Sequence, residues 1–164
     1  MQNFNFGLEY EYRLILSYQM YTLTYESVEA KRISSAEMED LLEQARENNQ
    51  KNKITGCLVY YNGRFIQILE GEREVVLNLY KKIQQDARHK EVHLFSDDDI
   101  EERTYPNWGM AYYPVDPNVF SKSELEQFRR NLLLLSDLSQ SKSVTAHLFW
   151  KRIKMYLKKS SKNK

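Results

Sequence analysis

The chain has 164 residues with a formal net charge of +1, and 41% of its residues are hydrophobic. This length and composition suit one domain with a substantial core, and the balanced charge gives no reason to expect nucleic acid or a membrane surface as a partner. No apolar run approaches the roughly 18 residues of a membrane span, no signal-peptide pattern opens the chain, and the single cysteine allows no internal disulfide, which favours a reducing cytoplasm.

The first predicted elements are a strand and a helix. Residues 1–19 show no clear periodicity, although the stretch YRLILSY would suit an extra edge strand, and we expect them to form an N-terminal extension. Alternating β-forming residues predict a strand over Met20–Ser27. Ser34 or Ser35 then caps a helix that runs to about Asn49, with acidic residues in its first turn.

A β-hairpin and a second helix follow. Residues 53–61 (KITGCLVYY) and 64–71 (RFIQILEG) predict two strands, and Asn62-Gly63 between them is a strong two-residue hairpin turn. From Glu72 to about Arg88, apolar residues recur at helical spacing.

Two more strands complete the predicted sheet. They span residues 91–96 (EVHLFS) and 108–114 (WGMAYYP), and the acidic segment DDDIEER between them is expected to be a solvated loop. The order β-α-β-β-α-β-β predicts an α+β, ferredoxin-like fold, in which two helices cover one face of a five-stranded split βαβ sheet.

Two C-terminal helices are predicted over about residues 121–137 and 142–159, and the basic tail KKSSKNK is expected to fray. We expect both helices to cover the second face of the sheet. Leu133, Leu134 and Leu138 lie off the main apolar stripe of the first one, which leaves open whether these helices also offer a surface to a partner.

Signatures of catalysis are scarce. The sequence contains no GxSxG, HExxH or CxxC motif and no glycine loop of the kind that holds phosphate, and its three histidines lack metal-ligand spacing. Cys57 lies in an apolar run, where a small buried hydrophobe is favoured over a reactive thiol. We therefore predict that the chain is not an enzyme.

Several polar residues stand where apolar ones are expected. Gln67 lies in the middle of RFIQILEG, where a side-chain amide is costly unless its donors and acceptor are matched. Tyr25 ends the first strand, and Asn48 and Asn49 close the first helix on a face that they share with Leu41. Because the first and third strands of such a sheet are adjacent and central, Tyr25 and Gln67 are expected to meet beneath this helix. Composition alone still favours a plain helix C-terminus and a locally satisfied glutamine.

These residues belong to longer pieces that resemble the BLUF domain, the blue-light sensor that uses flavin. The pieces are LTYES, ARENNQKNKITG, NGRFIQILEG, QQDARH and YPNWGM, which occur in the family's order and spacing. The resemblance covers about residues 20–113 and implies an isoalloxazine ring held between the two helices. Ala45 and Gly109 stand where relatives often carry a polar residue, which bears on the speed of dark recovery.

The resemblance also implies roles for individual residues. Tyr25 matches the light-active tyrosine, Gln67 the switching glutamine and Asn49 the asparagine at the flavin's carbonyl edge, while Trp108 and Met110 match two photoactive residues of the last strand. The implied flavin contacts are made by Tyr25, Leu41, Arg46, Asn48, Asn49, Phe65, Gln67, Lys82, Asp86, Arg88, His89 and Met110.

The side chains suit this chemistry. A carboxamide carries a donor and an acceptor, as the flavin edge requires, so rotation of the Gln67 amide or its conversion to the imidic-acid tautomer changes which group donates while hardly changing its shape. Tyr25 is expected to give an electron and a proton and then recover them. A rearranged hydrogen-bond network would remain.

We therefore predict a cytoplasmic blue-light photoreceptor that binds FAD, with FMN as the alternative cofactor. The flavin-binding domain spans residues 20–116. Residues 117–164 form a helical extension that signals to a separate protein effector or through a homo-oligomer, without nucleic acid or membrane. Two other functions remain open: a flavin-binding module that does not signal, and a ligand-free interaction domain.

Overall fold

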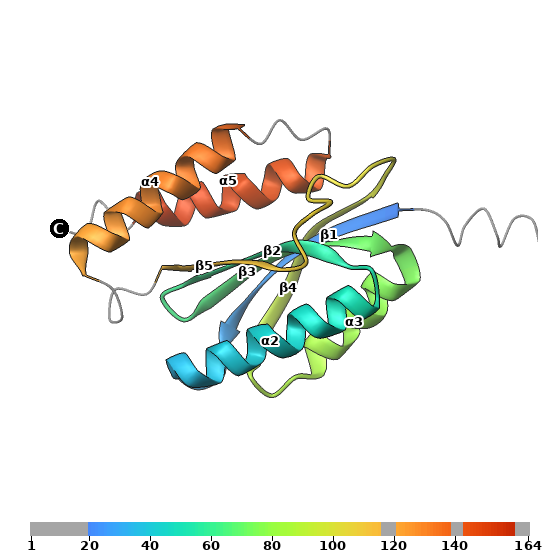
Figure 1. Ribbon diagram of the computed structural model, residues 1–164, viewed down its shortest axis with the longest axis horizontal. Coiled ribbons are helices and arrows are strands. Elements are labelled where there is room, and N and C mark those ends of the chain that lie inside the picture. Colours follow the sequence, from blue (N-terminus) through green and yellow to red (C-terminus); the bar gives the residue numbers. More distant parts are fainter. Residues whose placement is uncertain (1–19, 116–120, 139–142, 160–164) are drawn as a thin grey trace, which may run out of the picture.

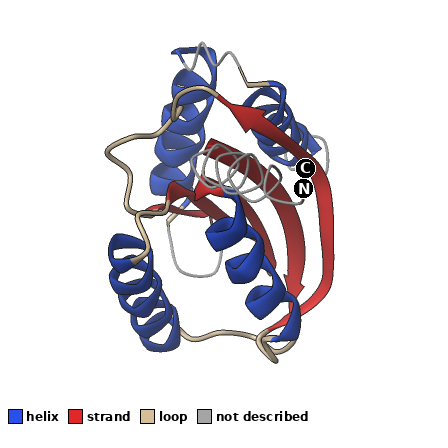
Figure 2. Ribbon diagram, turned by 90° about the vertical axis from the view of Figure 1, so that its right-hand side faces the viewer, coloured by secondary structure: helices blue, strands red, loops and turns tan. Residues whose placement is uncertain are grey.

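A computed structural model describes residues 20–115, 121–138 and 143–159 of the chain. Within these ranges it contains one sheet and four helices, arranged in layers with two helices on each side of the sheet (Figures 1 and 2). The elements are β1 (Met20–Glu29), α2 (Ser35–Lys51), β2 (Thr55–Tyr61), β3 (Arg64–Glu72), α3 (Arg73–Gln85), β4 (His89–Ile100), β5 (Ala111–Val115), α4 (Lys122–Leu138) and α5 (Val144–Lys159).

The sheet has five strands in the order β4-β1-β3-β2-β5, so β1 and β3 are adjacent and central as predicted. Neighbouring strands are antiparallel except β2 and β5, which run parallel. The β2–β3 hairpin turns at Asn62 and Gly63, whose φ angles of 46° and 75° suit a turn that requires positive φ at both central positions. The predicted α+β, ferredoxin-like fold is confirmed.

The start of α2 follows from its sequence. The Ser34 side chain accepts a hydrogen bond from the backbone N–H of Glu37, and the Glu37 carboxylate accepts one from the backbone N–H of Ser34. This capping box satisfies two amide groups at the helix start.

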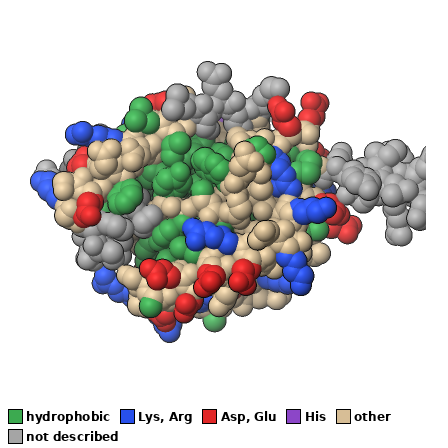
Figure 3. All heavy atoms as spheres, viewed as in Figure 1, with side chains coloured by type: hydrophobic (Ala, Val, Ile, Leu, Met, Phe, Trp, Pro, Cys, Tyr) green, Lys and Arg blue, Asp and Glu red, His purple; other side chains and the backbone are tan. Residues whose placement is uncertain are grey.

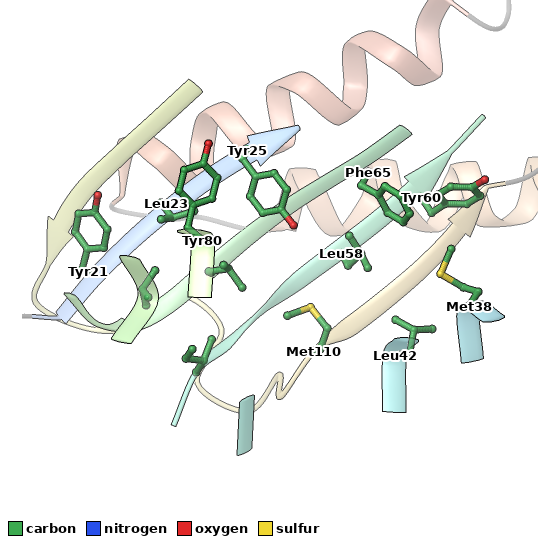
Figure 4. Packing of buried hydrophobic residues seen from close by; sticks show 13 residues of the cluster. Tyr21, Leu23, Tyr25, Met38, Leu42, Leu58, Tyr60, Phe65, Tyr80 and Met110 are labelled. Carbon is green, nitrogen blue, oxygen red and sulfur yellow. The ribbon is translucent and has the colours of Figure 1, made fainter. Parts of the chain in front are cut away.

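Each face of the sheet carries its own core. On one face, β1, β2 and β3 pack against α2 and α3 through residues such as Leu23, Leu58 and Phe65 (Figure 4). On the other face, α4 and α5 bury Leu132 and Phe149 against the sheet. The expectation that the C-terminal helices cover the second face is therefore confirmed.

The leucines that lie off the α4 stripe do not all behave alike. Leu133 is half-buried and packs against the second core, whereas 58% of Leu134 is exposed. The side chain of Leu138 lies outside the described residues, as does the proposed extension 1–19.

Some predicted boundaries were wrong. β4 runs on to Ile100, so the aspartates of DDDIEER are strand residues rather than a loop. They have partners: Tyr21 donates to Asp97 at 2.6 Å, and Arg73 lies 2.6 Å from Asp99. In addition, β5 begins at Ala111, which leaves Trp108 and Met110 in the segment before it.

In the described ranges, no helix combines the length and the hydrophobicity that a bilayer crossing would require. The same residues contain no group of three histidine, cysteine or acidic side chains that could hold a metal ion. Cys57 is a free, buried thiol in the second core, and its burial raises its pKa.

Candidate functional site

A cavity of about 230 Å³ lies between the central strands and the helices α2 and α3. Its volume is below the roughly 300–1,000 Å³ of sites that enclose a whole drug-sized ligand, so it suits a ring system whose substituents remain outside. Ten of the sequence-predicted site residues line it, namely Tyr25, Leu41, Asn48, Asn49, Phe65, Gln67, Lys82, Asp86, Arg88 and His89. Leu58, Leu79 and Ile83 are apolar and line the same cavity. Successive side chains of β2 point to opposite faces of the sheet, and Leu79 and Ile83 lie one helical turn apart on α3.

Tyr25 and Gln67 meet at the floor of this cavity. They are direct partners in the β1–β3 register, and the Tyr25 hydroxyl donates a short hydrogen bond to Gln67 Oε1. The other end of the amide is also engaged, because Gln67 Nε2 donates to Met110 Sδ at 3.2 Å. Gln67 therefore bridges the phenol of β1 and the thioether that precedes β5.

Tyr25 is held in its protonated form. Only 1% of the residue is exposed, and burial is the main cause that raises the pKa of its hydroxyl well above the ordinary value, with Tyr80 and Asp86 acting in the same direction. Loss of the proton alone would leave a buried anion, which is unfavourable. The proton is therefore expected to leave Tyr25 only together with an electron.

Sequence reasoning missed Tyr80, the aromatic neighbour of Tyr25. The two ring centroids are 5.4 Å apart, and Figure 4 shows both rings on the same face of the sheet. Tyr80 follows Leu79 on α3, and its position beside the apolar stripe was the available signal. It makes a second phenol available within contact distance of the first.

The C-terminal end of α2 supplies amide groups. Asn49 is 2% exposed, and its Nδ2 donates to the carbonyl of Gly109 at 3.3 Å. Arg46 does not line the 230 Å³ cavity. It borders an adjoining hollow of about 710 Å³ that Asn49, Trp108 and Gly109 also border, and its Nε lies 3.4 Å from the carbonyl of Met110.

The mouth of the cavity is charged. Asp86 accepts a 2.6 Å hydrogen bond from Arg88, which is the main cause that lowers the pKa of this carboxyl. Lys82 is exposed on α3. His89 Nδ1 lies 2.8 Å from Ser27 Oγ, and its ring packs on Phe65 with centroids 4.7 Å apart.

Trp108 lies away from the cavity. Its ring stacks on Tyr105 at a centroid distance of 4.9 Å and belongs to the second core, on the opposite side of the sheet from Gln67. Two residues that are two apart in a strand would share a face. Trp108 and Met110 do not, because a turn before β5, with Trp108 N–H bonded to the Tyr105 carbonyl, breaks the alternation.

The cavity has the chemistry that a flavin ring requires. Its lining is largely apolar, the side-chain amides of Gln67 and Asn49 lie in it, and the cationic Lys82 and Arg88 also line it. Leu41 and Phe65 offer flat or flexible apolar contacts to a planar ring. The residues of this chain therefore fit the group that the sequence resemblance implies.

The surroundings of His89 predict a pH dependence of stability. Burial is the main cause that holds the pKa of His89 below its ordinary 6.5, with Arg88 acting in the same direction and Asp86 opposing it. The unfolded chain therefore takes up this proton first, so the contribution to stability is complete above about pH 6.5 and is lost as the pH falls towards the lower folded-state pKa.

We expect the free energy of unfolding to fall between about pH 7.5 and about pH 5.5, and His89→Gln to flatten this dependence. Urea denaturation of both proteins at the two pH values is the measurement. An equally steep pH dependence in the variant would assign it to another group.

Comparison with known proteins identifies relatives in sequence. The family model described as "Sensors of blue-light using FAD", BLUF, matches residues 20–111. The photoactivated adenylate cyclase subunit beta of Euglena longa is 41% identical over 85 residues, which are 52% of this chain and 10% of that protein. Subunit alpha of Euglena gracilis is 36% identical over 123 residues, 75% of this chain and 12% of that protein. The chain thus spans about a tenth of the length of these relatives.

Solved structures agree with this relationship. The dark-state structure of BlrB, a BLUF protein, superposes with a TM-score of 0.63 at 25% identity and covers 82% of this chain and 95% of that one. A bacterial light-regulated adenylyl cyclase gives a TM-score of 0.58 at 35% identity over 72% of this chain and 36% of that one. The cavity between α2 and α3, its tyrosine–glutamine pair and a family match over more than half of the chain lead to one conclusion: this protein belongs to the BLUF family of flavin-using blue-light sensors.

Proposed function

We propose that the chain senses blue light through a flavin held in the α2–α3 cavity, and that Gln67 is the element that switches. The observation that carries this proposal is the double engagement of the Gln67 amide, whose oxygen accepts from Tyr25 and whose nitrogen donates to Met110. A carboxamide in this position has two orientations of nearly equal shape.

The two orientations of Gln67 differ in what their neighbours experience. In the orientation described here, Tyr25 donates and Met110 Sδ accepts. After rotation or tautomerisation, the Tyr25 oxygen and Met110 Sδ face different groups. Both ends of the amide are buried, and hydrogen bonds are stronger there than in water. Exchanging them therefore changes the energies of the two states appreciably.

When bound, a flavin supplies absorption of blue light and, once excited, an acceptor for an electron. Tyr25 is suited to donate an electron and a proton, because burial keeps the proton on its hydroxyl and this hydroxyl already donates a hydrogen bond to Gln67 Oε1. Asn49 and Gln67 would hold an edge of the ring, and the apolar wall around Leu58 and Phe65 would exclude water from it. Arg88 and Lys82 at the mouth favour an anionic tail.

Among flavins we propose FAD, which the description of the matching family names. FMN is the alternative, since a structure of BlrP1 from Klebsiella pneumoniae contains FMN. The cofactor set free by heat and identified by mass spectrometry distinguishes the two.

We further propose that the signal leaves the flavin-binding domain, residues 20–116, through the helical extension 117–164. The extension would contact a separate protein effector or a second copy of the chain, in the cytoplasm. Two exposed apolar residues of these helices support such a surface, since 58% of Leu134 and 65% of Val144 is exposed. Figure 3 also shows apolar side chains gathered between α2 and α4.

Hydrogen exchange in the dark and under blue light tests this relay. We expect illumination to change the exchange of backbone amides in α4 and α5, because a bias of a few kcal/mol between two packings of a helix is enough to shift their populations. Changes confined to the residues around the cavity, with unchanged protection in both helices, would contradict it.

A further inference from the structure

Glu26 lies beside Tyr25 in β1 but points to the opposite face of the sheet. On that face, Arg152 of α5 donates two hydrogen bonds to the Glu26 carboxylate. Its Nε donates to Oε2 at 2.8 Å, and a second guanidinium nitrogen donates a short bond to Oε1. The Tyr156 hydroxyl, also from α5, donates to Oε2 at 3.1 Å. The residue next to the light-active tyrosine is therefore attached directly to the C-terminal helix.

This contact is shielded from water on the Glu26 side, whereas 35% of the Arg152 side chain is exposed. Glu26 is 8% exposed, and the Arg152 guanidinium lies 5.7 Å from the centre of the Phe95 ring and 5.5 Å from that of Tyr156. Hydrogen bonds from Arg152 are the main cause that lowers the pKa of Glu26, so the carboxylate is charged at neutral pH. A partly buried arginine–carboxylate contact with two hydrogen bonds depends strongly on geometry, because both bonds must stay aligned.

The pairing of β1 with β4 is irregular on both sides of this point. The register shifts between Thr24 and Tyr25 and again between Glu26 and Val28. The backbone pairing with β4 is therefore less regular at Tyr25 and Glu26 than at residues Met20 to Thr24. We infer that β4 constrains Tyr25 and Glu26 less tightly.

The other end of α5 is tied to β4 instead. Asp98 accepts hydrogen bonds from the Ser143 hydroxyl at 3.2 Å and from the Thr145 backbone N–H at 3.3 Å, and Ser96 and Thr145 share a 2.8 Å hydrogen bond between hydroxyls. This regular part of the sheet holds the start of the helix. Further along α5, Arg152 and Tyr156 add polar contacts with β1 beside the buried side chains of Phe149, Ile153 and Leu157.

We propose that the Glu26–Arg152 pair is the contact through which the hydrogen-bond state of Tyr25 and Gln67 is passed to α5. The inference rests on the proposed function and names the route of its signal. Glu26 and Arg152 act as positioning residues, since neither touches the cavity. A small displacement of β1 when the Tyr25–Gln67 bond rearranges would misalign one of the two arginine hydrogen bonds, and α5 would move about its tethered start.

The test compares two double variants of the full, flavin-loaded chain. Glu26→Gln with Arg152→Gln removes both charges of the pair and so leaves no buried unpaired carboxylate. The matched control is Asp137→Asn with Lys154→Gln, which removes a 2.6 Å ion pair that joins α5 to α4 rather than to the sheet. Two readouts are recorded for each. The first is the shift of flavin absorption to the red on illumination, which we expect when the hydrogen bonds around the flavin rearrange, and the second is the light-induced change in hydrogen exchange in α5.

We expect the Glu26/Arg152 variant to keep the red shift while its exchange response in α5 falls at least about fivefold, the lower end of ordinary coupling between sites. The control should keep both responses. A wild-type response in α5 of the Glu26/Arg152 variant would overturn the inference. Absence of the red shift in the unmodified chain would instead defeat the proposed function.

Arg152→Lys keeps the test decisive if the double variant does not fold. Lysine retains the positive charge but provides a single ammonium in place of the planar fork. We expect this variant to bind flavin and photocycle with a reduced α5 response, and a full response would overturn the inference.

Discussion

Gln67→Leu is expected to retain flavin and to lose the reversible red shift entirely. Leucine has a similar volume and suits the apolar strand, but it has no group that can exchange donor for acceptor between Tyr25 and Met110. Removal of the buried acceptor of the Tyr25 hydroxyl is expected to cost about 1–3 kcal/mol of stability, partly offset by the new apolar contact. The measurement is the absorption spectrum before and after blue light, together with urea denaturation.

Gln44→Leu is a suitable control for this variant. Gln44 is a second carboxamide that lines the same cavity, but it lies exposed on α2. The control should photocycle with normal amplitude. A normal red shift in Gln67→Leu would show that the switch does not depend on the amide, and the assignment of Gln67 would be wrong.

Tyr25→Phe is expected to abolish the photocycle while the fold survives. Phenylalanine fills the same buried space, but it carries no hydroxyl proton and is harder to oxidise. The loss of the hydrogen bond to Gln67 Oε1 should cost about 1 kcal/mol. Transient absorption after a blue pulse is the measurement, since it detects whether any light state forms.

Tyr80→Phe provides the matched comparison, because its ring lies 5.4 Å from that of Tyr25 and loses the same atom. We expect a normal light state in this control. A normal light state in Tyr25→Phe would move the donor role elsewhere. Tyr80 would then be examined before Trp108, which the structure places on the other side of the sheet.

The sequence was sufficient to predict the parts of the fold that depend on local patterns. Alternation in MYTLTYES gave β1, the apolar run in RFIQILEG gave β3, Asn62-Gly63 gave the hairpin, and the Ser34 cap gave the start of α2. The meeting of Tyr25 and Gln67 followed from the adjacency of β1 and β3, which the order of elements implies.

What the sequence could not predict depends on contacts between distant segments. The aspartates at the end of β4 look like a loop in the sequence, and only the fold places Tyr21 and Arg73 beside them. The contact of Glu26 with Arg152 joins residues 126 positions apart, and neither residue interrupts a local pattern. The separation of Trp108 from Met110 depends on a turn that starts at Tyr105, whose backbone N–H donates to the Glu70 carboxylate of the distant strand β3.

The central claim is that light rearranges the hydrogen bonds around Gln67 beside a bound flavin. The most direct test is the absorption spectrum of the purified full chain, loaded with FAD, in the dark, after blue light and after return to darkness. We predict a flavin spectrum that shifts to the red on illumination and returns in the dark. A flavin spectrum that blue light leaves unchanged would describe a module that only carries the cofactor, and a chain that takes up no flavin would describe an interaction domain. Either result would contradict the claim.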